Sequence, residues 1–117
     1  MTHGDLCKVI RASRFQYSDE YKLQRGIAAL LTQLGLEYKA EVRLNAKDRI
    51  DFLVGDVGIE VKTEGALAAV TRQLWRYAQL PEVKHLVLVT TSHAHQNLPE
   101  EMNGRTLEVV YLLNSFL

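Results

Sequence analysis

Segment 49–62 predicts a β-hairpin, and it constrains the fold more than any other part of the chain. Two apolar-rich runs flank the dipeptide Gly55-Asp56. A two-residue loop that begins with glycine suits a type II′ turn, because the first central residue of that turn needs a positive φ. In the resulting register, residue 54 pairs with residue 57. Asp51 then lies directly opposite Glu60.

Three ionisable side chains stand in the two strands of this hairpin. Side chains alternate between the faces of a strand, so we expect Asp51, Glu60 and Lys62 on one polar face. The apolar face is then expected to consist of Ile50, Phe52, Val54, Val57, Ile59 and Val61.

The pairing of Asp51 with Glu60 points to a bound cation. Their Cβ atoms would lie roughly 5 Å apart, and two like charges at that distance destabilise a sheet unless positive charge lies between them. Two carboxylates beside a lysine are what a Mg²⁺ site for phosphate chemistry requires. The alternative is a hairpin with one solvated face of mixed charge. A helical pattern follows Lys62, so we expect the polar face to be covered.

Length and charge bound the remaining possibilities. A chain of 117 residues predicts a single domain, 1–117, with one sheet and a helical layer. The formal net charge of +0 gives no global signature of nucleic-acid binding, so DNA contacts would need a local basic patch. Basic residues are concentrated before residue 77, and only Lys84 and Arg105 follow. This bias indicates a basic face only weakly.

The chain also indicates a cellular compartment. Cys7 is the single cysteine, which excludes an intramolecular disulfide framework and fits a reducing environment. Segment 1–5 has no secretory-signal pattern, and no apolar run approaches the ~20 residues of a membrane helix. We therefore expect a cytoplasmic protein without a membrane partner.

The N-terminal third predicts one helix. Segment 1–17 is poorly periodic and is interpreted as an N-terminal arm or a short strand. Ser18 is a suitable N-cap for a helix that runs to about Leu34, with Gly35 as its stop. Glu20 continues the core-facing apolar stripe of this helix by one turn, so it could reach the site. Its alternative role is to offset the helix dipole in the first turn.

The rest of the chain predicts an α/β fold. Alternation in segment 38–44 indicates a strand, and the stripe that begins at Leu67 indicates a helix ending near Pro81. The continuous apolar run 85–91 is typical of a buried parallel strand, and 107–113 resembles a last strand. The predicted order is α-β-β-β-α-β-(β), a mixed sheet flanked by helices.

The second helix supplies further polar candidates. Gln73 lies on the flank of the buried stripe and could lean toward Glu60 and Lys62, although it could also be a surface residue. Arg72 and Arg76, four residues apart, could meet phosphates or be solvated.

These elements and residues together resemble the PD-(D/E)XK nuclease superfamily, in particular its small junction-resolving and phage-type members. The resemblance covers residues 18–91. The chain departs from the superfamily's motif at one position, because the residue before Asp51 is Ile50 and not the proline that the letter P denotes. The residues that carry it are Glu20, Asp51, Glu60, Val61, Lys62, Gln73 and Tyr77.

The resemblance implies a restriction-endonuclease-like αβββαβ core and a metal-dependent deoxyribonuclease. An endonuclease, which cuts at internal phosphodiester bonds, is expected. Asp51, Glu60 and Glu20 would hold Mg²⁺ or Mn²⁺, with the Val61 carbonyl as a further ligand. Lys62 would orient or deprotonate water or stabilise charge, and Gln73 would position water or phosphate. DNA is the expected partner, possible substrates include branched or junction DNA, and the small size suggests a homodimer.

Two other functions compete with the nuclease. A non-catalytic DNA-binding or assembly protein could keep the fold, although Asp51, Glu60 and Lys62 are all present. A zinc protein could use His93 and His95, but these supply only two of the four ligands that a structural site needs. The remaining candidate ligands for zinc are His3, His85 and Cys7.

Overall fold

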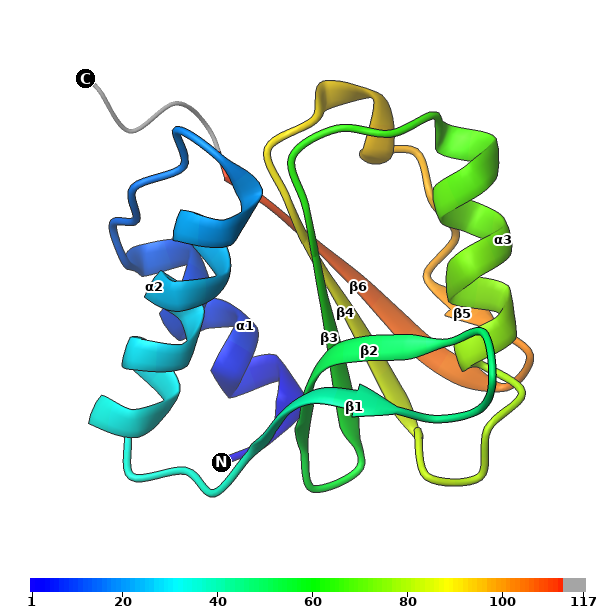
Figure 1. Cartoon of the computed structure of the whole chain (residues 1–117), viewed down its shortest axis with the longest axis horizontal. Coiled ribbons are helices and arrows are strands. Elements are labelled where there is room, and N and C mark those ends of the chain that lie inside the picture. Colours follow the sequence, from blue (N-terminus) through cyan, green and yellow to red (C-terminus); the bar gives the residue numbers. More distant parts are fainter. Residues whose placement is uncertain (113–117) are drawn as a thin grey trace.

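The computed structural model describes residues 1–112 and has an α/β fold with a six-stranded mixed open sheet (Figure 1). Its elements are α1 (His3–Ala12), α2 (Glu20–Gln33), β1 (Lys39–Arg43), β2 (Arg49–Val54), β3 (Val57–Lys62), α3 (Leu67–Tyr77), β4 (His85–Thr90), a 3₁₀ turn (His93–His95), β5 (Glu101–Met102) and β6 (Arg105–Tyr111). No helix in this range is long and apolar enough to cross a membrane.

The strand order in the sheet is β1-β2-β3-β4-β6-β5. Strands β1, β2 and β3 form an antiparallel meander, and β3, β4 and β6 run parallel. Helices α1 and α2 lie against one face, and α3 lies against the other (Figure 1). The sheet is therefore the middle layer of three.

Strand β4 is covered on both faces. Val87 and Val89 pack in the cluster beneath α1 and α2, whereas Leu86 and Leu88 pack in the cluster beneath α3. Burial on both sides explains the unbroken apolar run 85–91, because neither face of this strand meets water. The predicted buried parallel strand is confirmed.

The hairpin that was predicted between β2 and β3 is also confirmed. Val54 pairs with Val57 across a loop in which Gly55 has a φ of 60°. The regular ladder continues to the pair of Phe52 and Ile59 and is not continued beyond it. From the turn to the pair of Phe52 and Ile59, the observed register is the predicted one. The next predicted pair, Asp51 with Glu60, lies beyond the end of the regular ladder.

The prediction that Ile50 shares a sheet face with Phe52 is wrong. Phe52 packs in the cluster beneath α2, but Ile50 packs in the cluster beneath α3. Opposite this part of β2, Glu41 of β1 adopts the left-handed φ of 51° and has no partner in the β1–β2 register. This irregularity breaks strict alternation at the position between Ile50 and Phe52, and Asp51 occupies that position.

The N-terminal segment is a helix, which corrects the prediction of an arm or strand for residues 1–17. Thr2 and Asp5 form a capping box at the start of α1. Leu6 and Ile10, four residues apart, are buried beneath the helix. The buried stripe of α1 spans only two turns, so it leaves little periodic signal in the sequence.

The other boundaries differ from prediction only slightly. Asp19, not Ser18, caps α2 by accepting a hydrogen bond from the Lys22 N–H, and Gly35 follows the helix with a φ of 72°. Of the predicted last strand 107–113, residues up to Tyr111 belong to β6. Residue 113 lies outside the described range.

Candidate active site

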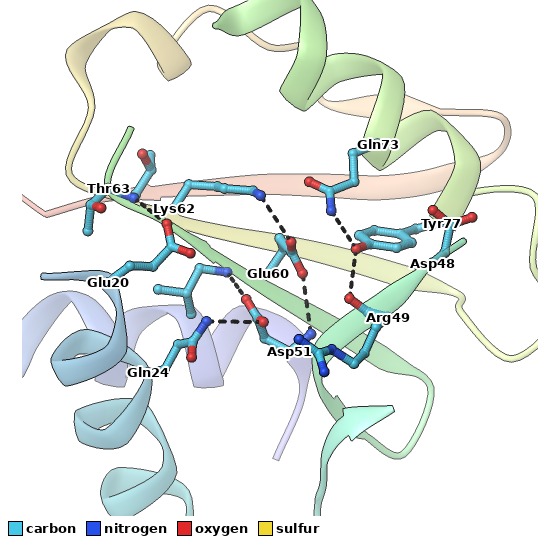
Figure 2. Close-up of polar contacts among 12 residues, drawn as sticks. Glu20, Gln24, Asp48, Arg49, Asp51, Glu60, Lys62, Thr63, Gln73 and Tyr77 are labelled. Carbon is cyan, nitrogen blue, oxygen red and sulfur yellow. Dashed lines mark hydrogen bonds and ion pairs between the residues drawn. The ribbon is translucent and has the colours of Figure 1, made fainter. Parts of the chain in front are cut away.

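Asp51 and Glu60 lie where β2 and β3 separate, and each binds the backbone of the opposite strand. Glu60 Oε1 accepts a hydrogen bond from the Asp51 N–H at 3.3 Å. Asp51 Oδ2 accepts one from the Val61 N–H at 2.7 Å (Figure 2). The two carboxylates thus replace the main-chain ladder that ends at Phe52 and Ile59. We call this arrangement the carboxylate fork.

Glu60 points away from the α1–α2 layer, as predicted, because Ile59 and Val61 beside it pack into that layer. Asp51 departs from the predicted shared face. Its Oδ1 accepts a hydrogen bond from Gln24 of α2 at 3.2 Å, so the carboxylate reaches back toward the α2 side. The two acids are adjacent but do not stand side by side on one pleated surface.

Burial dominates the electrostatics of the fork. Glu60 is only 3% exposed. Burial, and next the charge of Asp51, raise the pKa of Glu60 to about 8, against the opposing effect of Lys62. Burial also raises the pKa of Asp51, and the nearby charge of Glu20 adds to this, while the Val61 hydrogen bond opposes it. The surroundings of the fork therefore disfavour the charged form of both acids.

Lys62 is the basic residue at the fork. Its Nζ lies 3.5 Å from Glu60 Oε2, and its side chain is 22% exposed (Figure 2). Its backbone pairs with Thr90 at the end of β4, and its carbonyl accepts a hydrogen bond from the N–H of the next residue, Thr91. The ammonium group is thus placed beside the acids and remains accessible to a ligand.

Helix α2 supplies the third carboxylate. Glu20 Oε1 accepts a hydrogen bond from the Thr63 N–H at 3.1 Å, immediately after Lys62 (Figure 2). Glu20 begins the helix, and Gln24 follows it one turn later on the same side. The first turn of α2 is therefore fastened to the end of β3, which brings Glu20 near Asp51 as the sequence predicted.

Helix α3 closes the opposite side of the fork. Gln73 Nε2 donates to the Tyr77 hydroxyl at 2.9 Å, and that hydroxyl donates to the Arg49 carbonyl at 3.0 Å (Figure 2). Burial raises the pKa of Tyr77, with the charge of Glu60 as the next cause. Gln73 thus leans toward the sheet as predicted, but its hydrogen bond goes to Tyr77 and not to a carboxylate.

A second ion pair fastens α3 to the turn before β2. Arg76 Nε donates to Asp48 Oδ1 at 2.8 Å, and Asn45 donates to Asp48 Oδ2 at 3.0 Å. Burial acts to raise the pKa of Asp48, but the hydrogen bonds from Arg76 and Asn45 outweigh it and lower the pKa. Of the two arginines that could meet phosphates or be solvated, Arg76 therefore has an internal partner, whereas Arg72 is exposed.

The donor set of the fork fits a hard divalent cation in kind. It consists of carboxylate oxygens and the Val61 carbonyl, which faces the fork because the N–H and C=O of one strand residue point to the same neighbouring strand. Among residues 1–112, however, no three His, Cys, Asp or Glu side chains already form a metal-binding group. Asp51, Glu60 and Glu20 are each held by backbone N–H groups, so a bound ion would need them to shift.

The histidines do not gather in one place. His3 stacks on His85 at the start of β4, with ring centroids 4.0 Å apart. His95, beyond the end of β4, is fully buried between Thr90 Oγ1 at 2.8 Å and the Gly65 carbonyl at 2.7 Å. His95 is thus a core residue, and both of its ring nitrogens already have partners within the protein.

Two functional contacts were missed by the sequence reasoning. Gln24 binds Asp51, and a step of one turn from Glu20 along the helix could have found it. The pairing of Asp48 with Arg76 joins residues 28 positions apart, and no local pattern signals it. Comparison with protein-family models, with curated proteins and with solved structures found no match to this chain.

Proposed function

We propose that this protein is a divalent-metal-dependent nuclease that hydrolyses phosphodiester bonds in DNA. The observation that carries the proposal is the carboxylate fork with Lys62 beside it. Buried carboxylates with raised pKa values are costly to a fold, and they occur preferentially at functional sites. A divalent cation between Asp51 and Glu60 would remove that cost.

The succession α2-β1-β2-β3-α3-β4 supports a restriction-endonuclease-like core, because it reproduces the order αβββαβ. In this proposal Asp51 and Glu60 hold Mg²⁺ or Mn²⁺, and Glu20 and the Val61 carbonyl complete the protein ligands. The metal supplies charge neutralisation at the phosphate and a more acidic bound water.

The chain's own groups have separate tasks in this chemistry. Lys62, as an ammonium group, orients the attacking water, and its charge stabilises the negative charge that develops on phosphate. Gln73, held against Tyr77, positions water or a phosphate oxygen. Gln24 keeps the Asp51 carboxylate in the fork. A homodimer stays a prediction from chain size, which light scattering on the purified protein tests.

The second candidate is a DNA-binding or assembly protein that does not cut. The observation in its favour is that Glu20, Asp51 and Glu60 are all satisfied by hydrogen bonds within the protein. Such a network can also serve only to join α2 to the two strands. Cleavage, and not binding, therefore separates the two candidates.

The test is a panel of labelled linear, flap and four-way-junction DNAs, incubated with Mg²⁺ or Mn²⁺ and with EDTA as control. The nuclease proposal expects fragments that depend on metal and disappear with Asp51→Asn, a change that retains the shape of the side chain. Binding without cleavage of any substrate in either metal supports the second candidate.

A further inference from the structure

An exposed aromatic side chain stands beside the fork on α2. Tyr21 is 63% exposed, although it follows Glu20 directly in the first turn of the helix. The Arg25 guanidinium lies 5.7 Å from the centre of the Tyr21 ring and donates to its hydroxyl at 3.3 Å. The ring is therefore held by Arg25 while much of its surface remains open to solvent.

Two hollows meet at this pair of residues. The inner hollow, about 160 Å³, lies between α2 and strands β1 and β2, and Asp51 and Glu41 help to line it. The outer hollow, about 480 Å³, lies between α2 and the preceding loop, and Arg14 and Lys22 help to line it. Tyr21 and Arg25 line both hollows, so a continuous surface runs from the outer hollow to Asp51.

The charges of the two hollows are opposite. Arg14, Lys22 and Arg25 line the outer hollow without a carboxylate, and none of the three has an ion-pair partner in the described part of the chain. The inner hollow carries two acids, Glu41 and Asp51, against the single base Arg25 that it shares with the outer hollow. The outer hollow therefore attracts phosphate, and the inner hollow disfavours it while offering the face of Tyr21.

We propose that Tyr21 stacks an unpaired base, with the adjoining phosphates bound by Arg14, Lys22 and Arg25, so that single-stranded DNA is led to the fork. This inference rests on the proposed nuclease function for the fate of the strand, but binding itself does not depend on catalysis. An aromatic face beside a basic groove is how proteins bind single strands without reading sequence. A base within a duplex is stacked on its neighbours and could not reach Tyr21.

The volume of the inner hollow also limits the size of a group that can enter it. Its volume of about 160 Å³ lies below the roughly 300–1,000 Å³ typical of small-molecule pockets, so it takes a fragment such as one base. The exposed Trp75 on α3 provides a matched comparison, because it is 48% exposed and lines neither hollow.

Binding in EDTA tests the proposal without any cleavage. A fluorescent single strand of about 16 nucleotides is compared with the duplex of the same sequence by anisotropy. We expect the single strand to bind at least about tenfold more tightly. Tyr21→Ala should weaken single-strand binding by roughly 5- to 150-fold, the range of one lost base stack, and Tyr21→Phe should retain it. Trp75→Ala should leave affinity unchanged.

A single strand that carries 2-aminopurine reports stacking directly, since stacking quenches its fluorescence. Quenching by wild type and Tyr21→Phe but not by Tyr21→Ala is expected. Equal affinity for the duplex, or an equal loss in Tyr21→Ala and Trp75→Ala, would overturn the proposal. A failure of the nuclease assay leaves these binding results intact, and metal-dependent cleavage unaffected by Tyr21→Ala would sink this inference alone.

Discussion

The backbone N–H of Asp51 donates to Oε1 of Glu60 at 3.3 Å, at the point where β2 and β3 separate. A buried carboxylate thus occupies the place of a main-chain acceptor. The Asp51 carboxylate does the same for the Val61 N–H. The exchange keeps two acids adjacent in the interior of the sheet, where either would otherwise be unfavourable.

The raised pKa of Glu60 predicts that stability falls as pH rises in metal-free buffer. The folded state holds a proton up to about pH 8, whereas the unfolded chain releases it near the ordinary value of 4.5. The folded state therefore binds more protons between these values, and stability declines across that window, by up to about 1.4 kcal/mol per pH unit. Urea unfolding at several pH values measures the decline. Glu60→Gln, which keeps an acceptor for the Asp51 N–H, should flatten it, and an unchanged slope in this variant would refute the assignment.

A bound divalent metal ion should offset the loss of stability that the two neighbouring acids cause. Mg²⁺ or Mn²⁺ that binds only the folded fork raises stability by mass action, about 1.4 kcal/mol at ten times the dissociation constant. Thermal unfolding with and without metal measures the effect, and Asp51→Asn should remove it. Because Mg²⁺ often draws part of its shell from substrate phosphates, the titration is repeated with DNA bound. Identical melting temperatures in all these conditions would count against a metal site.

The Asp48–Arg76 pair predicts a contrast between two arginines of α3. Arg76→Ala leaves the buried Asp48 without its closest donor and should cost about 1–3 kcal/mol of unfolding free energy. Arg72→Ala, one turn earlier and exposed, should change stability by less than about 0.5 kcal/mol. Chemical denaturation of both variants checks this. Equal effects would mean that the ion pair does not hold α3 to the sheet.

Tyr77→Phe tests the connection between α3 and the start of β2. The change strands the Arg49 carbonyl and the Gln73 amide, and we expect a loss of about 1–3 kcal/mol. Tyr38→Phe is the matched control, because within residues 1–112 the Tyr38 hydroxyl has a hydrogen bond only to Thr32, in an exposed position. Denaturation curves that coincide for the two variants would remove this role from Tyr77.

The hairpin could be predicted from sequence because its signals are local. Gly55 fixes the turn, the turn fixes the register, and the register places Asp51 near Glu60. The direction of the Asp51 side chain could not be predicted, because strict alternation breaks between Ile50 and Phe52, where the β1–β2 register also skips Glu41. Strict alternation holds only where both neighbouring ladders are regular.

Tertiary contacts account for the other differences. Helix α1 was missed because its stripe is only two turns long, although the capping box of Thr2 and Asp5 was a usable signal. The burial of His95 depends on Thr90 and the distant Gly65 carbonyl, which a sequence pattern does not bring together. Prediction thus succeeded where turn chemistry or a sustained apolar pattern gave a local signal, and it failed for contacts such as that of His95 with the Gly65 carbonyl.

The rate of DNA cleavage by Lys62→Ala tests the central claim most directly. Cleavage is measured at saturating protein with Mg²⁺ or Mn²⁺, next to binding of the same DNA, and Lys84→Ala serves as an exposed-lysine control. If Lys62 acts on the chemical step, its loss should slow cleavage by at least about 100-fold while affinity changes little, because affinity is spread over many phosphate contacts. Wild-type protein that cuts no DNA in either metal, or a Lys62→Ala variant that cuts at the wild-type rate, would contradict the account.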